Sequence, residues 1–462
     1  MATLADAIIA ENNNDVRQLL AYGEDVNQLD EYGFTPLIEA AIVNNLEISK
    51  FLLENGADPN RQDVTGGTAL HWAAENNNVE LCKLLISYQA DPNAYTFSGK
   101  PVLVMPMLRH QSTLKKLLIK HGADQVFAQD YIYTKLLGHL FELVGTATIV
   151  DPKNNFVEVD FEGFFLEVTV GLISDSLQQF KNHFASRQMR RYAGIEQFII
   201  DLLNHAGQLL QYTQYLIDVR KHKTHINSLI QQDPLLIPVG YEGHAITFIR
   251  YGDVWVKCDR REDSRLFDNI MFYRMTNYKN FTKSLLLELL YNKQSSEFIN
   301  EDLDSILGLQ PITELKIEAQ ISGNCSWANV EAVIPALFFL VLMKMNPNET
   351  DLSHFKSLAI SFFHQWREWN KDRALYFCIE SFKEADAVRK ACKAEILAAV
   401  LFQCCRPDRY ADQVRIETIL SLLMNSPYEY LIKDYLRVYL YENYTDEGKQ
   451  FAQLLRSHGY LK

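Results

Sequence analysis

The sequence is short of positive charge, of cysteine and of long apolar runs, and each shortage excludes a class of protein. It has 45 Lys and Arg against 58 Asp and Glu, a formal net charge of −13, so it lacks the broad basic field that non-specific nucleic-acid binding requires. Seven cysteines in 462 residues do not resemble a disulfide framework and favour a reducing compartment. The longest apolar run, 333–343, is interrupted by Pro335 and is too short to span a bilayer. We therefore expect no direct nucleic-acid partner and no membrane span.

Common signatures of enzymes are missing as well. The sequence has no GxxxxGK[ST] phosphate loop and no HExxH zinc helix, which argues against nucleotide hydrolysis and the common zinc proteases. No cofactor and no metal site is therefore expected. The first residues lack the basic and apolar segments of a secretory signal, so we expect a soluble chain.

What is present is ordinary globular chemistry. Hydrophobic residues make up 48% and charged residues 22% of the chain, which excludes a disordered or collagen-like protein. The length is about three times the roughly 150 residues typical of one domain, so two or three domains are expected.

A repeat with a period of 33 residues fills the N-terminal quarter of the chain. Its repeated positions are Asp25, Asp58, Asp91 and Asp124, followed two residues later by Asn27, Asn60 and Asn93. Thr35-Pro36-Leu37 recurs as Thr68-Ala69-Leu70-His71 with the same period. These motifs resemble the ankyrin repeat, which opens a helix with Thr-Pro-Leu-His and closes each unit with Gly-Ala-Asp-x-Asn. The resemblance covers residues 1–125, about four repeats, and implies an α-solenoid of stacked helix pairs.

Ankyrin arrays are binding surfaces, and the candidate binding residues in this array are Asn60, Asn93 and Trp72. The leucine-rich context of Asn60 and Asn93 resembles that of ankyrin asparagines modified by a host asparaginyl hydroxylase. That resemblance makes such a hydroxylase a candidate partner. The alternative is structural, because an asparagine at this place can hold its turn through side-chain hydrogen bonds.

The repeat period stops after residue 125, and we expect a second domain at 126–345. Within it, 156–169 alternates apolar and polar residues, which predicts a hairpin that turns at Glu162-Gly163. Residues 172–230 have the apolar spacing of helices. The remainder, 346–462, shows helical periodicity throughout and is expected to form a helical C-terminal region.

Two segments carry residues suited to catalysis, and the first reads as two strands around a turn at Gly252-Asp253. Glycine in the first position suits a two-residue hairpin loop, which pairs Tyr251 with Val254. In that register His244 and Asp259 share one face of the sheet as diagonal neighbours. A shift of one residue would place them on opposite faces.

The second segment places Cys325 at the start of a helix. Gly323 and Asn324 break the preceding structure, and a long apolar helix is expected directly afterwards. The positive end of a helix dipole favours the thiolate over the thiol, and a nearby imidazole would lower the pKa of the thiol further. A structural alternative remains, in which Cys325 is a small buried side chain and His244 a hydrogen-bonded core histidine.

These two segments resemble the papain-like cysteine protease superfamily. Gly-x-Cys-x-Trp at 323–327 resembles its nucleophile segment, and Gly-His-Ala at 243–245, followed by a strand that ends in Asp259, resembles its base and orienting residue. The resemblance implies that Cys325 is the nucleophile, His244 the general base and Asp259 the orienting residue. It also implies that Gln320 donates to the oxyanion beside the Cys325 backbone N–H.

The order of these residues departs from that of the superfamily. The cysteine usually precedes the histidine, whereas His244 comes 81 residues before Cys325. A circularly permuted arrangement would restore the site, because such a triad is defined by geometry rather than by chain order. Gln320 is also one residue closer to the cysteine than its counterpart in papain.

The expected fold class is therefore α+β, an N-terminal ankyrin α-solenoid followed by a cysteine protease-like α/β core and a mostly helical C-terminal region. This combination is similar to the ankyrin-repeat effectors that Legionella delivers into host cells. That resemblance implies type IV secretion, host proteins as partners, and a place in the host cytoplasm or nucleus. Two functions stay open: cleavage or acyl transfer at a peptide or isopeptide bond, and a catalytically inactive scaffold that binds host protein.

Overall fold

The computed structural model describes residues 3–163, 165–213, 222–260, 270–320 and 323–461. The chain divides into two compact units. The ankyrin unit contains residues 1–137, 145–161 and 376–462, and the sheet unit contains residues 138–144 and 162–375. The predicted C-terminal region is helical as expected, but its residues from 376 onward group with the ankyrin repeats. The predicted three-part division at 125 and 345 stays a prediction.

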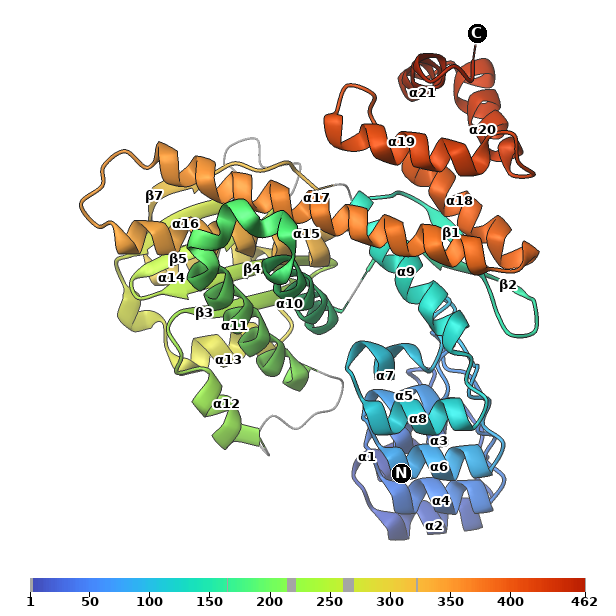
Figure 1. The fold of residues 1–462 in the computed structure, drawn as a ribbon. Coiled ribbons are helices and arrows are strands. Elements are labelled where there is room, and N and C mark those ends of the chain that lie inside the picture. Colours follow the sequence, from blue (N-terminus) through green and yellow to red (C-terminus); the bar gives the residue numbers. More distant parts are fainter. Residues whose placement is uncertain (1–2, 164, 214–221, 261–269, 321–322, 462) are drawn as a thin grey trace. The chain divides into compact units, whose positions relative to one another are not determined.

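The N-terminal part of the ankyrin unit is a stack of short helix pairs, as the repeat predicts (Figure 1). The pairs are α1 (Leu4–Ile9) with α2 (Asn13–Ala21), α3 (Pro36–Ile42) with α4 (Leu46–Glu54), α5 (Ala69–Glu75) with α6 (Val79–Ser87), and α7 (Val104–Leu108) with α8 (Ser112–Lys120). Leu52 and Leu85 are fully buried between the helices. Each second helix is followed by a residue of positive φ, Gly56 at 88° in one repeat and Gln89 at 68° in the next. Glycine adopts this conformation without strain, which explains its place in the motif.

An asparagine side chain links each repeat to the next one. In Asn60, Nδ2 donates to the Gln89 carbonyl at 2.9 Å and Oδ1 accepts from the Asp91 N–H at 2.7 Å. Asn27 and Asn93 make the same pair of bonds to the repeats that follow them. These asparagines therefore have a structural role, although their side chains bond to the next repeat rather than to their own turn.

The rest of the ankyrin unit is built from a hairpin and from helices of the C-terminal region. The hairpin pairs β1 (Thr146–Val150) with β2 (Phe156–Asp160), and α18 packs against β1. The helices are the first part of α9 (Gln125–Phe141), the last part of α17 (Ser353–Glu384), α18 (Ala387–Gln403), α19 (Tyr410–Leu423), α20 (Glu429–Tyr435), η6 (Leu436–Glu442) and α21 (Asp446–Ser457).

The predicted hairpin at 156–169 is wrong in its second half. Residues 156–160 do form a strand, but its partner lies upstream at 146–150, and residues 166–169 begin the helix α10 (Leu166–Asn182). Val168 and Val170 are buried there on a helix rather than in a strand. Short alternating apolar text does not distinguish a strand from the first turn of a buried helix.

The sheet unit is organised around one antiparallel sheet with strand order β3-β4-β5-β6-β7. Its strands are β3 (Leu235–Tyr241), β4 (His244–Tyr251), β5 (Val254–Cys258), β6 (Ile270–Met275) and β7 (Leu309–Leu315). The helical elements of this unit are α10, η1 (Phe184–Tyr192), α11 (Ala193–Leu210), η2 (Gln211–Thr213), α12 (Lys223–Leu229), η4 (Tyr278–Asn280), α13 (Lys283–Tyr291), η5 (Phe298–Asp302), α14 (Leu303–Leu307), α15 (Cys325–Glu331), α16 (Val333–Met345) and the first part of α17. Figure 1 shows these elements in green, yellow and orange.

The run formed by α15 and α16, residues 325–345, is the one helical stretch among the described residues that is long and apolar enough to cross a membrane. Of its most apolar 18-residue window, 89% is buried within the protein. Phe338, Phe339 and Leu340 are fully buried. Core helices of globular proteins have this same composition, so the stretch is weak evidence for a membrane span.

The asparagine links predict a measurable contribution to the stability of the array. Asn60→Ala removes one donor and one acceptor, and we expect the free energy of unfolding to fall by about 1–2 kcal/mol. Urea unfolding followed by circular dichroism measures this loss. Asn14→Ala is the control, since Asn14 is an exposed helical asparagine and its replacement should cost little. A loss below about 0.5 kcal/mol for Asn60→Ala would contradict the role of these bonds.

Candidate active site

Cys325 is the first residue of α15, as the sequence predicts. The preceding residue, Asn324, is held by His139: its Oδ1 lies 2.5 Å from the His139 ring Nδ1, and its Nδ2 donates to the His139 carbonyl at 3.2 Å. Gly323 has φ of 86°, and a Cβ there would lie 2.7 Å from the Cγ atom of Glu162. The positive φ therefore favours glycine two residues before the cysteine, and a side chain there would also displace that of Glu162.

The predicted hairpin and its register are confirmed. β4 and β5 pair with Tyr251 opposite Val254, across a loop in which Gly252 has φ of 61°. His244 is the first residue of β4, and Asp259 directly follows β5. The register therefore brings both side chains to the same end and the same face of the sheet, where His244 Nε2 lies 3.0 Å from Asp259 Oδ1.

The His244 ring contacts Cys325 as well as Asp259, and this changes the pKa of both groups. Burial alone disfavours the imidazolium, but hydrogen bonds to Asp259 and Cys325 and the charges of both groups raise the pKa of His244 to about 9. Burial also disfavours the Cys325 thiolate, yet hydrogen bonds from His244 and from the backbone of Ala245 and Ser326 hold the pKa of the thiol below its usual range. A thiolate next to an imidazolium is the form in which a cysteine acts as a nucleophile.

The other cysteines lie in different surroundings. Burial raises the pKa of five thiols above the usual range: Cys82, Cys258, Cys378, Cys392 and Cys405. Cys404 is partly exposed, as Cys325 is. Among the thiols with a shifted pKa in the described chain, the shift favours the thiolate at Cys325 alone.

Gln320 is buried on the segment that follows β7, and its backbone N–H donates to the Arg260 carbonyl at 2.8 Å. Its side-chain Oε1 has no hydrogen-bond partner among the described residues. The side-chain amide is thus not engaged through its oxygen in holding the fold. The structure places Gln320 beside Arg260, one residue after Asp259, and its role toward an oxyanion stays a prediction.

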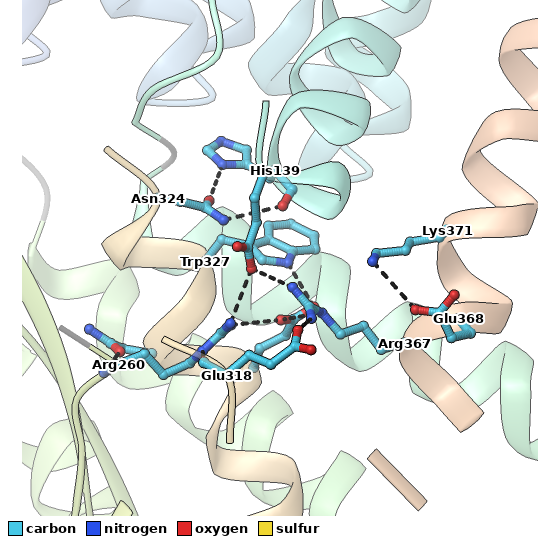
Figure 2. Close-up of polar contacts among 11 residues, drawn as sticks. His139, Arg260, Glu318, Asn324, Trp327, Arg367, Glu368 and Lys371 are labelled. Atoms are coloured by element: carbon cyan, nitrogen blue, oxygen red, sulfur yellow. Dashed lines mark hydrogen bonds and ion pairs between the residues drawn. The ribbon is translucent and has the colours of Figure 1, made fainter. Parts of the chain in front are cut away.

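A buried cluster of charges supports this end of the sheet (Figure 2). The Arg260 guanidinium is fully buried and pairs with Glu142 at 3.1 Å and with Glu331 at 3.3 Å. Arg367 pairs with the same two carboxylates and with Glu318. Two guanidinium groups thus face two buried carboxylates, so the charges compensate each other away from water.

The cluster is joined to the helix that carries Cys325. Glu331 ends α15, and its Oε1 accepts from the indole N–H of Trp327 at 3.1 Å. The Trp327 ring stacks on the His139 imidazole, with ring centroids 5.7 Å apart. Figure 2 shows Trp327 between the pair of His139 and Asn324 and the guanidinium groups of Arg260 and Arg367. The charged cluster and the His139 contact therefore fix α15 relative to the end of β5.

These supporting residues were not predicted from the sequence. Glu331 stands alone in the apolar text around 330–334, and a lone carboxylate there was a usable signal, since buried charges in proteins are paired. His139 lies in the last turn of α9 and Glu142 directly follows the helix, both far along the chain from Cys325. No local pattern marks such long-range contacts.

The candidate binding residues of the array are partly engaged in the fold. The Trp72 indole N–H donates to Asp63 at 3.0 Å, and its ring packs edge-on against Phe34. Asn60 and Asn93 line a groove together with Phe97, which is 71% exposed, and Lys153 from the β1–β2 turn. Asn60 and Asn93 thus line one groove of the array, and Trp72 is not among its lining residues.

The chain has matches among known proteins. The family described as ankyrin repeats (many copies) matches residues 39–86. No curated protein matches the sequence. Among solved structures, that of the Legionella effector AnkH is 39% identical in sequence, with a TM-score of 0.88, and the match covers 100% of this chain and 98% of that chain.

The buried charges predict a large effect of removing one partner. Glu331→Ala leaves two buried guanidinium groups short of a carboxylate, so we expect the free energy of unfolding of the sheet unit to fall by about 3–5 kcal/mol. Urea unfolding followed by tryptophan fluorescence measures this. Arg274→Ala is the control, because its pair with Asp253 is exposed and should contribute little. A loss below about 1 kcal/mol for Glu331→Ala would contradict the supporting role of the cluster.

Proposed function

The chain belongs to the family of the Legionella effector AnkH, and from this we propose that it is an effector with a cysteine-dependent active site that works on host protein. The ankyrin repeats bind the host protein. Cys325, His244 and Asp259 then cleave, or transfer the acyl group of, a peptide or isopeptide bond.

The observation that carries the catalytic part is the double contact of the His244 ring. Its Nε2 lies 3.0 Å from Asp259 Oδ1, and Cys325 also acts on the ring, raising the pKa of His244 through hydrogen bonding and charge. Since Nε2 faces the carboxylate, Nδ1 is the ring nitrogen left for the sulfur. A histidine held by a carboxylate and bonded to a thiol at a helix start is the arrangement that cysteine acyl-transfer chemistry requires. A histidine that served packing alone would not need both partners.

The reaction follows from these positions. The Cys325 thiolate adds to the carbonyl carbon of the bond, and a C–S bond forms while the carbonyl electron pair moves to oxygen. As the oxyanion collapses, the C–N bond breaks and the His244 imidazolium gives its proton to the departing amine. A thioester then links the substrate acyl group to Cys325.

The second half of the reaction resolves the thioester. His244, now neutral, takes a proton from water or from an acceptor amine, whose oxygen or nitrogen adds to the thioester carbonyl. The C–S bond breaks and the thiolate is restored beside the imidazolium. Water yields hydrolysis and an amine yields transfer, and Asp259 holds the ring in place throughout. The Cys325 backbone N–H and the Gln320 side-chain amide would donate to the oxyanion.

Recognition of host protein rests on the array. Exposed side chains recur at the tips of the turns between repeats, with Val64 at 62% and Phe97 at 71% exposed, 33 residues apart. Apolar side chains exposed at equivalent places of successive repeats are suited to contact a partner. Delivery by type IV secretion, action in the host cytoplasm or nucleus, and modification of Asn60 and Asn93 by a host asparaginyl hydroxylase belong to the same proposal.

A mechanism-based probe tests the catalytic part. A ubiquitin or peptide bearing a thiol-reactive group at its C-terminus should label the full-length protein, and Cys325→Ala should abolish the labelling. His244→Ala should reduce it at least about 100-fold, because the base and the ion pair are lost together. Gel shift and mass spectrometry of the labelled peptide measure this.

Cys404→Ala provides the matched control, since Cys404 is the other partly exposed thiol. It should leave labelling unchanged. Labelling that survives Cys325→Ala, or that is absent from the unmodified protein, would contradict the enzyme and leave an inactive host-protein scaffold as the function.

A further inference from the structure

The backbone pairing of β4 with β5 ends before the next hydrogen-bonded pair of the register is formed. The last pair is Thr247 with Cys258, and two residues further along the same antiparallel register Ala245 would lie opposite Arg260. Both residues are buried, so their backbone groups need partners other than water. The backbone groups of Ala245 and Arg260 do not bond to each other, however.

Each of these four backbone groups is instead bonded to a residue near the nucleophile. The Ala245 carbonyl accepts from Asn329 Nδ2 at 2.5 Å, and the Arg260 N–H donates to Asn329 Oδ1 at 2.7 Å. The Arg260 carbonyl accepts from the Gln320 N–H at 2.8 Å. The Ala245 N–H acts as a donor toward the sulfur of Cys325, which lowers the pKa of the thiol.

Asn329 therefore takes the place of a rung of the sheet. It is 1% exposed and lies on α15 four residues after Cys325, so both side chains project from the same face of the helix. Its amide offers one donor and one acceptor, as a peptide group does, and the two groups it satisfies would otherwise pair with each other. The amide keeps the ends of the two strands apart.

We propose that Asn329 is a positioning residue of the active site, which holds β4 and β5 apart so that the Ala245 N–H and His244, itself held by Asp259, face Cys325. Ala245 follows His244 and Arg260 follows Asp259, so one side chain fixes the backbone next to both the base and its orienting residue. This inference rests on the proposed function. It adds a residue outside the nucleophile, base and orienting residue, and it assigns the Ala245 N–H as a donor to the thiolate.

The role has a consequence for Cys325 that packing alone would not have. If Asn329 aligns the Ala245 N–H and His244, its loss removes hydrogen bonds that stabilise the thiolate. Reaction with iodoacetamide requires the thiolate. At a pH well below the pKa of the thiol, a rise of one pKa unit therefore lowers the alkylation rate about tenfold.

The experiment measures alkylation of Cys325 in the full-length protein from pH 5 to pH 10, by mass spectrometry of the peptide that contains it. Asn329→Leu keeps the branched shape of the side chain but has neither donor nor acceptor. At a pH well below the thiol pKa of the unmodified protein, we expect its alkylation to be about tenfold slower or more. Asn329→Asp keeps the acceptor for Arg260 and loses the donor to Ala245. We expect a loss for it as well, since the donor to Ala245 is gone and the added carboxylate disfavours the thiolate, and it serves if Asn329→Leu does not fold.

Asn370→Leu is the matched control. Asn370 is also a buried asparagine of the sheet unit, with a side-chain hydrogen bond from Arg373 at 3.0 Å. This variant should lose thermal stability while the pH profile of Cys325 stays as in the unmodified protein. An Asn329 variant that behaves in the same way, less stable but with an unchanged pH profile, would overturn the positioning role.

The same data separate this inference from the proposed function. If the unmodified protein shows a thiol pKa in the usual range at Cys325, the proposed function fails and the positioning role fails with it. If the unmodified protein has a low thiol pKa that the Asn329 variants retain, the positioning role alone fails.

Discussion

The sheet unit depends on how the ends of β4 and β5 meet the start of α15. Buried backbone groups must be bonded, and here the strand ends bond to the helix and its preceding segment instead of to each other. As a result the two strands separate at this end of the sheet, and the Cys325 thiol lies next to the end that carries His244 and Asp259. The charge cluster of Arg260, Glu142, Glu331 and Arg367 also links the residue after Asp259 to the last residue of α15 (Figure 2).

In both units an asparagine side chain completes the hydrogen bonding of backbone groups from two separate segments. In the array, the Asn60 amide accepts from one backbone N–H and donates to one backbone carbonyl of the next repeat. In the sheet unit, the Asn329 amide does so between two strands. The asparagine side chain has the donor and acceptor of a peptide group, so it can complete backbone pairing where two segments do not run alongside each other.

Much of this could be predicted from the sequence where the signal was local or periodic. The 33-residue period gave the helix pairs, and a two-residue loop at Gly252-Asp253 determined which residues face each other across β4 and β5. The start of a helix at Cys325 followed from Gly323 and Asn324. The hairpin predicted at 156–169 was wrong because a short alternation of apolar and polar residues fits both a strand and the first turn of a buried helix, here α10. Asn329, His139 and Glu142 could not be predicted, since their partners lie 69 to 225 residues away along the chain.

The central claim is that His244 is an imidazolium held between Asp259 and the Cys325 thiolate. NMR titration of the histidine rings in the full-length protein tests it most directly, with the His244 signal among the 12 histidines identified by its loss in His244→Gln. We expect His244 to stay protonated at pH 8 and to titrate with a pKa of about 9, and we expect Asp259→Asn to lower this value. A His244 ring that titrates near 6.5 or below would contradict the ion pair and the active site built on it.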